Sequence, residues 1–213
     1  MNDNRNYHFS ADSTASRDEY PIIADLIDKP RAKVIDLGSG DGSLLLLLKN
    51  SKKVQGEGVE ISRSGVKVSL QKGLKVRQGK IDTLLPYKDK QFDYATCNVT
   101  LQMVMYPEIL LQEMHRISRF QIVTFPNFAF ALNRLELLIK GVMPKTMIPS
   151  YDWYSTGHIH QLSIQDFRNF CDRNKFKILK ESHIFPKSLF GSTKIVLKNY
   201  PNLFASTAVF LTK

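Results

Sequence analysis

Short apolar runs alternate along the chain with segments whose apolar residues recur at helical spacing. Runs of four to eight apolar residues flanked by turns are typical of buried strands, and the 3.6-residue period indicates helices. The predicted strands are 32–38, 54–61, 74–81, 92–99 and 119–127. The predicted helices among them are 43–50, 62–73 and 109–117. This alternation predicts an α/β fold with a doubly wound, mostly parallel, Rossmann-like sheet.

The two ends of the chain complete this prediction. A helix is expected at 17–29 and another at 130–141, and Ser163 with Asp166 forms a capping box that opens a further helix. Two closing strands, predicted at 176–185 and 203–213, would form an antiparallel C-terminal pair. We expect residues 1–16 to be a polar, flexible tail and 17–213 to be one domain, with residues 142–162 as an irregular loop or lid.

Composition excludes several classes of protein. Hydrophobic residues make up 43% and charged residues 23% of the 213 residues, as in ordinary globular domains. No segment has a signal-peptide core or the roughly 18 apolar residues that would span a bilayer, so we expect a cytoplasmic protein with no membrane partner. The net charge of +10 is scattered, which favours a solvated surface over a nucleic-acid site. Cys97 and Cys171 are too few for a disulfide framework and are expected in the core.

A glycine-rich loop follows the first predicted strand in the stretch VIDLGSGDGS. Gly38, Gly40 and Gly42 allow close approach of the backbone to a ligand, but Ser43 stands where a dinucleotide fingerprint has its third glycine. No Walker lysine follows. Asp36 and Asp41 would repel a pyrophosphate and suit a cationic ligand, which points to S-adenosylmethionine with its sulfonium and ammonium groups.

Acidic and amide residues follow the next strands. Glu60 ends the second strand about 20 positions after the loop, the spacing of a carboxylate that binds ribose hydroxyls. The alternative is a solvated strand end. Asp82 would accept a bond from adenine or serve as a turn residue, and Asn98 would line the cofactor or substrate. The predicted cofactor residues, for S-adenosylmethionine or S-adenosylhomocysteine, are Asp36, Gly38, Ser39, Gly40, Asp41, Gly42, Glu60, Ile61, Ile81, Asp82 and Asn98.

Together these motifs resemble the class I S-adenosylmethionine-dependent methyltransferases over about residues 20–213. The stretches FDYATCNVTLQMV, VTFPNFAF and MPKTMIPSYDWYSTGHIHQLSIQDF are similar more narrowly to the methionine biosynthesis protein family MetW. That resemblance implies a role in methionine synthesis with homoserine O-acetyltransferase as partner. The chain departs from the family pattern in two places: Lys80 replaces an acidic residue, and Gly157 and His158 replace a Pro-Asn pair.

The sequence assigns no catalytic residue. His160 and Tyr154 are weak candidates in the 142–162 loop, where His160 would act as a general base or simply bond to the backbone. His158 and His160 lack further ligands at suitable spacing, so no metal site is expected. The alternatives to a MetW-like binding protein are a methyltransferase acting on a small molecule and, from net charge alone, one acting on RNA.

Overall fold

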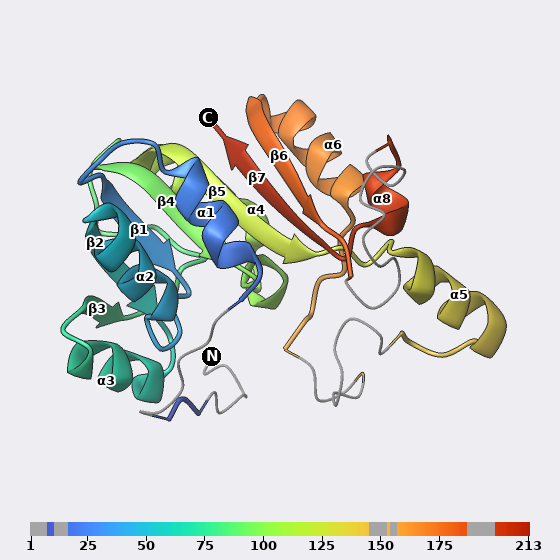
Figure 1. Cartoon of the computed structure of the whole chain (residues 1–213), viewed down its shortest axis with the longest axis horizontal. Helices are drawn as coiled ribbons and strands as arrows, with labels where there is room; N and C mark the ends of the chain where they lie inside the picture. The colour runs from blue at the N-terminus through green and yellow to red at the C-terminus, as the bar shows by residue number, and fades with distance from the viewer. Residues whose placement is uncertain (1–7, 11–16, 145–152, 154–156, 187–198) are drawn as a thin grey trace.

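A seven-stranded sheet forms the centre of the computed structural model, which describes residues 8–10, 17–144, 153, 157–186 and 199–213. Its strand order is β3-β2-β1-β4-β5-β7-β6 (Figure 1). The strands are β1 (Lys33–Leu37), β2 (Gln55–Glu60), β3 (Lys75–Gln78), β4 (Phe92–Asn98), β5 (Ser118–Pro126), β6 (Ile178–Ile184) and β7 (Thr207–Thr212).

Strands β1 to β5 run parallel, and β7 is antiparallel to both β5 and β6. The predicted fold, a mostly parallel sheet with an antiparallel C-terminal pair, is confirmed. Strand β1 lies between β2 and β4, so that Asp36 is in register with Gly58 on one side and Thr96 on the other. The strand order reverses at β1, and ligands of open α/β sheets bind at the carboxyl edge of such a point.

Helices cover both faces of the sheet. They are α1 (Glu19–Leu26), α2 (Ser43–Lys52), α3 (Arg63–Gln71), the 3₁₀ helix η1 (Leu101–Met103), α4 (Pro107–Ile117), α5 (Ala131–Lys140), α6 (Ile164–Asn174) and α8 (Pro201–Phe204). Ile23 of α1 and Leu48 of α2 belong to the core of one face. Met114 of α4 and Phe167 of α6 belong to the core of the other. The predicted capping box is present, since Ser163 Oγ accepts from Asp166 N at 3.1 Å.

The predicted strand at 203–213 is wrong in its first residues. Residues 201–204 form helix α8, and β7 begins only at Thr207. Pro201 occupies the first helical position, where its fixed φ suits a helix and its missing N–H costs nothing. The side-chain amide of Asn127 holds this turn, donating to Asn202 O at 3.0 Å and Ala205 O at 2.9 Å. A local sequence pattern could not predict this helix, because the residue that holds it, Asn127, is more than 70 positions away.

Helix α5 extends from the body at the side opposite β3 (Figure 1). Asn133 is its only buried residue. Exposed apolar residues at the i, i+3, i+4 spacing of one helical face are followed by Val142 just beyond the end of the helix, and we call these four residues the α5 row: Leu135, Leu138, Ile139 and Val142. Leu138 is 81% and Ile139 76% exposed.

Much of the predicted 142–162 lid, including Tyr151 and Tyr154, lies outside the described residues, as does most of the predicted tail. In the part of the chain that the structure describes, no helix combines the length and apolarity needed to cross a bilayer.

Candidate functional site

The glycine loop connects β1 to α2 at the carboxyl edge of the sheet. Gly38 and Gly42 have φ of +81° and +76°, a conformation that favours glycine. Each also lies against a neighbour: a Cβ on Gly38 would be 2.5 Å from Thr100 Cγ2, and one on Gly42 would be 2.5 Å from Leu74 Cδ1. These two glycines are therefore required by packing alone, whatever the loop binds.

Glu60 is held against this loop. Its carboxylate accepts from Gly40 N at 2.8 Å through one oxygen and from Ser62 N at 2.8 Å through the other. The side chain is buried, with the residue 6% exposed, so the alternative of a solvated strand end is wrong. A carboxylate only accepts hydrogen bonds, and its two oxygens are a chemical match for the two hydroxyl donors of a ribose. The structure thus brings Glu60 and the glycine loop together as the sequence predicted.

Asp36 lies at the centre of the same edge and is only 2% exposed. Thr96 Oγ1 donates to its Oδ1 at 2.7 Å. The pKa of Asp36 is raised to about 7, because burial and, to a lesser extent, the charge of Glu60 outweigh the lowering effect of the Thr96 bond. Burial, followed by the charge of Asp36, likewise raises the pKa of Tyr20 on α1. An acid poised near neutrality is common where a buried group meets a ligand.

Asp41 requires a correction. Its carboxylate accepts from Ser43 N at 3.0 Å and from Ser43 Oγ at 2.8 Å, at the start of α2. Lys72 Nζ lies 3.0 Å from the same carboxylate. Burial opposes ionisation, but the bonds from Ser43 and Lys72 outweigh it and hold the pKa of Asp41 below its ordinary value. The charge that we expected to face a cationic ligand is therefore compensated within the protein.

Asn98 positions a carboxylate that the sequence analysis missed. Its Nδ2 donates to Glu19 Oε1 at 3.2 Å, and its Oδ1 accepts from Thr124 Oγ1. Glu19 opens α1 and is buried. The bond places it beside the carboxyl end of β4, near the edge that carries Asp36. An acidic residue at the start of the predicted first helix was visible in the sequence, but no sequence pattern indicated that it would bond to Asn98.

The remaining predicted residues contribute differently. Ser39 is buried against β2, where a Cβ on Gly58 would be 2.8 Å from its Oγ. Ile81 packs in the core, whereas Ile61 is half-buried beside the end of β2. Asp82 Oδ2 accepts from Met105 N at 3.0 Å and from Tyr106 N at 3.3 Å. Asp82 therefore holds the backbone before α4, which corresponds to the turn alternative.

His160 lies next to the same backbone. Its Nε2 is 3.3 Å from Met105 O, and its N–H donates to Gln102 O at 3.1 Å. The described end of the predicted lid thus runs along η1, at the carboxyl edge of the sheet. Tyr154, the other weak catalytic candidate, lies outside the described residues, and Trp153 is 74% exposed. This contact with a backbone carbonyl corresponds to the second of the two roles considered for His160, that of bonding to the backbone rather than acting as a general base.

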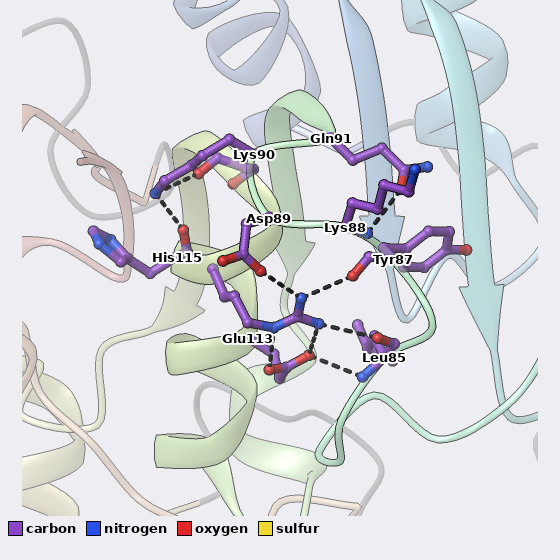
Figure 2. A network of polar contacts seen from close by, with 10 residues as sticks. Leu85, Tyr87, Lys88, Asp89, Lys90, Gln91, Glu113 and His115 are labelled. Atoms are coloured by element: carbon purple, nitrogen blue, oxygen red, sulfur yellow. Dashed lines mark hydrogen bonds and ion pairs between the residues drawn. The ribbon is translucent and has the colours of Figure 1, made fainter.

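Arg116 of α4 fixes the segment that follows Asp82 (Figure 2). Its guanidinium pairs with Glu113 through Nε at 2.8 Å and Nη2 at 2.7 Å. It also donates to Leu85 O at 3.0 Å, Tyr87 O at 2.8 Å and Asp89 Oδ1 at 2.9 Å. This network was not predicted, because it joins residues nearly 30 positions apart. It gives the loop between β3 and β4 a fixed path beside the candidate site.

The described residues contain no cluster of three or more His, Cys, Asp or Glu side chains that could hold a metal ion. Cys97 and Cys171 are both buried and free, as the core interpretation predicted. Burial raises the pKa of each thiol to about 12. Neither is a thiolate at neutral pH, so neither is activated as a nucleophile.

Solved structures share this architecture. An S-adenosylmethionine-dependent methyltransferase from Mesorhizobium loti is similar with a TM-score of 0.68 and 15% identity, over 94% of this chain and 99% of that one. Magnesium protoporphyrin IX methyltransferase from Synechocystis, solved with bound S-adenosylhomocysteine, has a TM-score of 0.64 and 17% identity, over 91% and 80%. At these identities the likeness establishes the fold, which is that of class I methyltransferases.

Sequence comparison is more specific. The model of the family described as methionine biosynthesis protein MetW matches residues 17–212. The bifunctional methionine biosynthesis protein MetXA/MetW of Rhodopirellula baltica is 31% identical over 209 residues, which is 93% of this chain. The match spans 33% of that relative's length, so the chain corresponds to about a third of the fused protein. The chain belongs to the MetW family.

Proposed function

We propose that the chain binds S-adenosylmethionine or S-adenosylhomocysteine at the glycine loop and acts in methionine biosynthesis together with a homoserine O-acetyltransferase. The observation that carries the ligand is the buried Glu60 carboxylate, held by Gly40 and Ser62. In this position it would accept both ribose hydroxyls of an adenosyl group. The fold of the solved methyltransferases supports this placement.

The charge of the site supports a cationic ligand. Glu19, Asp36 and Glu60 are buried carboxyl groups near one edge of the sheet. The lysine closest to the loop, Lys72, is engaged by Asp41. Arg17 lies 3.9 Å from Glu19, but a phosphate placed against Gly38–Gly42 would still meet the carboxyl groups of Asp36 and Glu60, whereas a sulfonium or ammonium group would be attracted to them. The site therefore suits S-adenosylmethionine better than a nicotinamide dinucleotide or a nucleoside triphosphate.

Ligand-dependent thermal unfolding tests this part of the proposal. We expect S-adenosylmethionine and S-adenosylhomocysteine to raise the unfolding temperature and NAD and ATP to leave it unchanged. A ligand present at 100 times its Kd stabilises the native state by about 2.7 kcal/mol. Stabilisation by NAD or ATP in place of both adenosyl compounds would contradict the proposal. Labelled methyl groups supplied with S-adenosylmethionine and a metabolite extract test the alternative, a methyltransferase acting on a small molecule.

The proposed partner is supported by the fused relative, in which a MetXA part and a MetW part share one polypeptide. A protein that works beside such a partner needs a surface for it. The α5 row is an apolar face of the kind that marks interaction sites, and each of its residues is at least 48% exposed. The proposal therefore assigns α5 to the acetyltransferase.

Co-purification with a homoserine O-acetyltransferase tests the partnership, with the rate of that enzyme as a second readout. We expect complex formation by the unmodified chain and its loss when Leu138 and Ile139 are both replaced by Glu. Leu70→Glu is the matched control, because Leu70 is an exposed leucine on a different helix, α3. Absence of any complex and of any rate change with the unmodified chain would refute the partnership. Binding that survives the double replacement would refute only the assignment to α5.

A further inference from the structure

Phe9 contacts the candidate cofactor site from a distant part of the sequence. The described segment 8–10 lies beside α3 (Figure 1), and Phe9 N donates to Ser64 Oγ at 3.1 Å. Phe9 is half-buried although its neighbours His8 and Ser10 are exposed. A single aromatic residue of a polar segment is therefore anchored on the domain.

Two glycines provide the seat for the Phe9 ring. A Cβ atom on Gly40 would lie 3.3 Å from ring atoms Cε1 and Cζ, and one on Gly65 would lie 3.1 Å from Cδ2. A side chain at either position would require the ring to shift by a few tenths of an ångström, and at Gly65 its Cβ would also lie 2.7 Å from Gly40 O. The same point on Gly65 is 3.1 Å from Glu60 Cγ, so the ring stands next to the Glu60 side chain.

Hydrogen bonds connect Phe9 to the group that holds Glu60. Ser64 Oγ, which accepts from Phe9, is 2.9 Å from Ser62 Oγ. The backbone N–H of Ser62 donates to Glu60 Oε1 at 2.8 Å. The Phe9 ring thus lies near the Glu60 side chain, whose carboxylate accepts from the backbone amide of Gly40.

We propose that Phe9 is a specificity-determining wall of the adenosyl site, whose ring lies against the ribose side of the bound nucleoside. This inference rests on the proposed function. The ring would exclude water from the Glu60 carboxylate and so strengthen its bonds to the ribose hydroxyls. It would also supply apolar contact to a nucleoside, which an alanine cannot do. The ligand class is an adenosine derivative.

Calorimetric titration with S-adenosylhomocysteine and with 5′-methylthioadenosine tests the proposal. Loss of an aromatic contact to a nucleobase or nucleoside costs affinity of the order of tenfold. We expect Phe9→Ala to weaken both ligands by about tenfold, to the same extent, because both carry the nucleoside. Phe9→Tyr should restore the affinity. Tyr200→Ala is the control, since Tyr200 is an exposed aromatic residue beside α8.

The unfolding temperature of the ligand-free Phe9→Ala protein should equal that of the unmodified chain, which separates a ligand contact from a structural role. Equal affinity of the Phe9→Ala and unmodified chains would overturn the inference and leave the proposed function standing. Tighter binding by Phe9→Ala would also overturn it, because the ring would then compete with the ligand. Failure of the unmodified chain to bind either compound would overturn the proposed function itself.

Discussion

Thr96 Oγ1 donates a hydrogen bond to the buried carboxyl group of Asp36 at 2.7 Å, across the pairing of β4 with β1. This bond favours the ionised form of Asp36, yet burial and the neighbouring Glu60 prevail and raise the pKa to about 7. An unfolded chain would ionise the same group near its ordinary pKa of 3.8. The Asp36 carboxyl group therefore couples folding and ligand binding to protons at neutral pH.

Stability should depend on pH through Asp36. The native state holds a proton that the unfolded state has lost between about pH 4 and pH 7, so over this window the contribution of Asp36 to the free energy of unfolding falls as pH rises. The stabilising contribution is complete below the unfolded pKa and is gone above the folded one. Replacement by Asn removes the titration. We expect the unmodified chain to lose more stability than Asp36→Asn between pH 5 and pH 8, measured by urea denaturation, and parallel losses would contradict the assignment.

Binding of S-adenosylmethionine should release a proton near pH 6.5. A sulfonium close to Asp36 favours its ionised form, so the ligand lowers the pKa of the carboxyl group and a bound proton leaves. Calorimetry in buffers of different ionisation enthalpy measures this release. S-adenosylhomocysteine lacks the sulfonium and should release less. Proton release that persists unchanged in Asp36→Asn would assign it to another group.

Glu60→Gln should weaken the binding of S-adenosylhomocysteine by about 2 kcal/mol, or roughly 30-fold, because a neutral amide forms weaker bonds to hydroxyl donors than a carboxylate does. Glu57→Gln is the matched control. Glu57 lies on the same strand, three residues before Glu60 and therefore away from the end of β2 that meets the glycine loop. Titration calorimetry measures both. Equal affinities of the two variants would remove Glu60 from the site.

Arg116→Ala should destabilise the fold by about 2–4 kcal/mol, because it leaves the buried Glu113 carboxylate without its guanidinium and exposes two carbonyl groups without donors. The Arg116 bonds hold the pKa of Glu113 below its ordinary value. The stabilisation is therefore present above the unfolded pKa of Glu113 and lost as pH falls through the folded one. Urea denaturation measures the change, and the exposed Arg119→Ala should leave stability within about 0.5 kcal/mol.

Most of the fold could be predicted from local patterns in the sequence. Alternation of apolar runs with helical periods predicted the parallel sheet, and Ser163 with Asp166 marked the start of α6 because a capping box is a contact within four residues. The position of Glu60 beside the glycine loop followed from the geometry of adjacent parallel strands. These features depend on interactions that recur at fixed spacing.

Features made by distant residues were not predicted. The pairing of Asp41 with Lys72 joins positions 31 apart, and that of Asn98 with Glu19 joins positions 79 apart. Phe9 reaches Ser64 across 55 positions. Such contacts depend on how helices settle on the sheet, and no spacing rule encodes them. They decide which carboxylates are compensated within the chain and which are left for a ligand.

Met105 lies between two side chains from opposite parts of the site. Asp82 holds its N–H and His160 lies against its carbonyl. A molecule that displaces Asp82 would free the N–H of Met105, and a molecule that displaces His160 would free its carbonyl. A ligand whose binding depends on one of these contacts would, by thermodynamic reciprocity, affect the other contact to the same degree that it is affected by it. The backbone of Met105 thus connects the segment after β3 to residues 157–162.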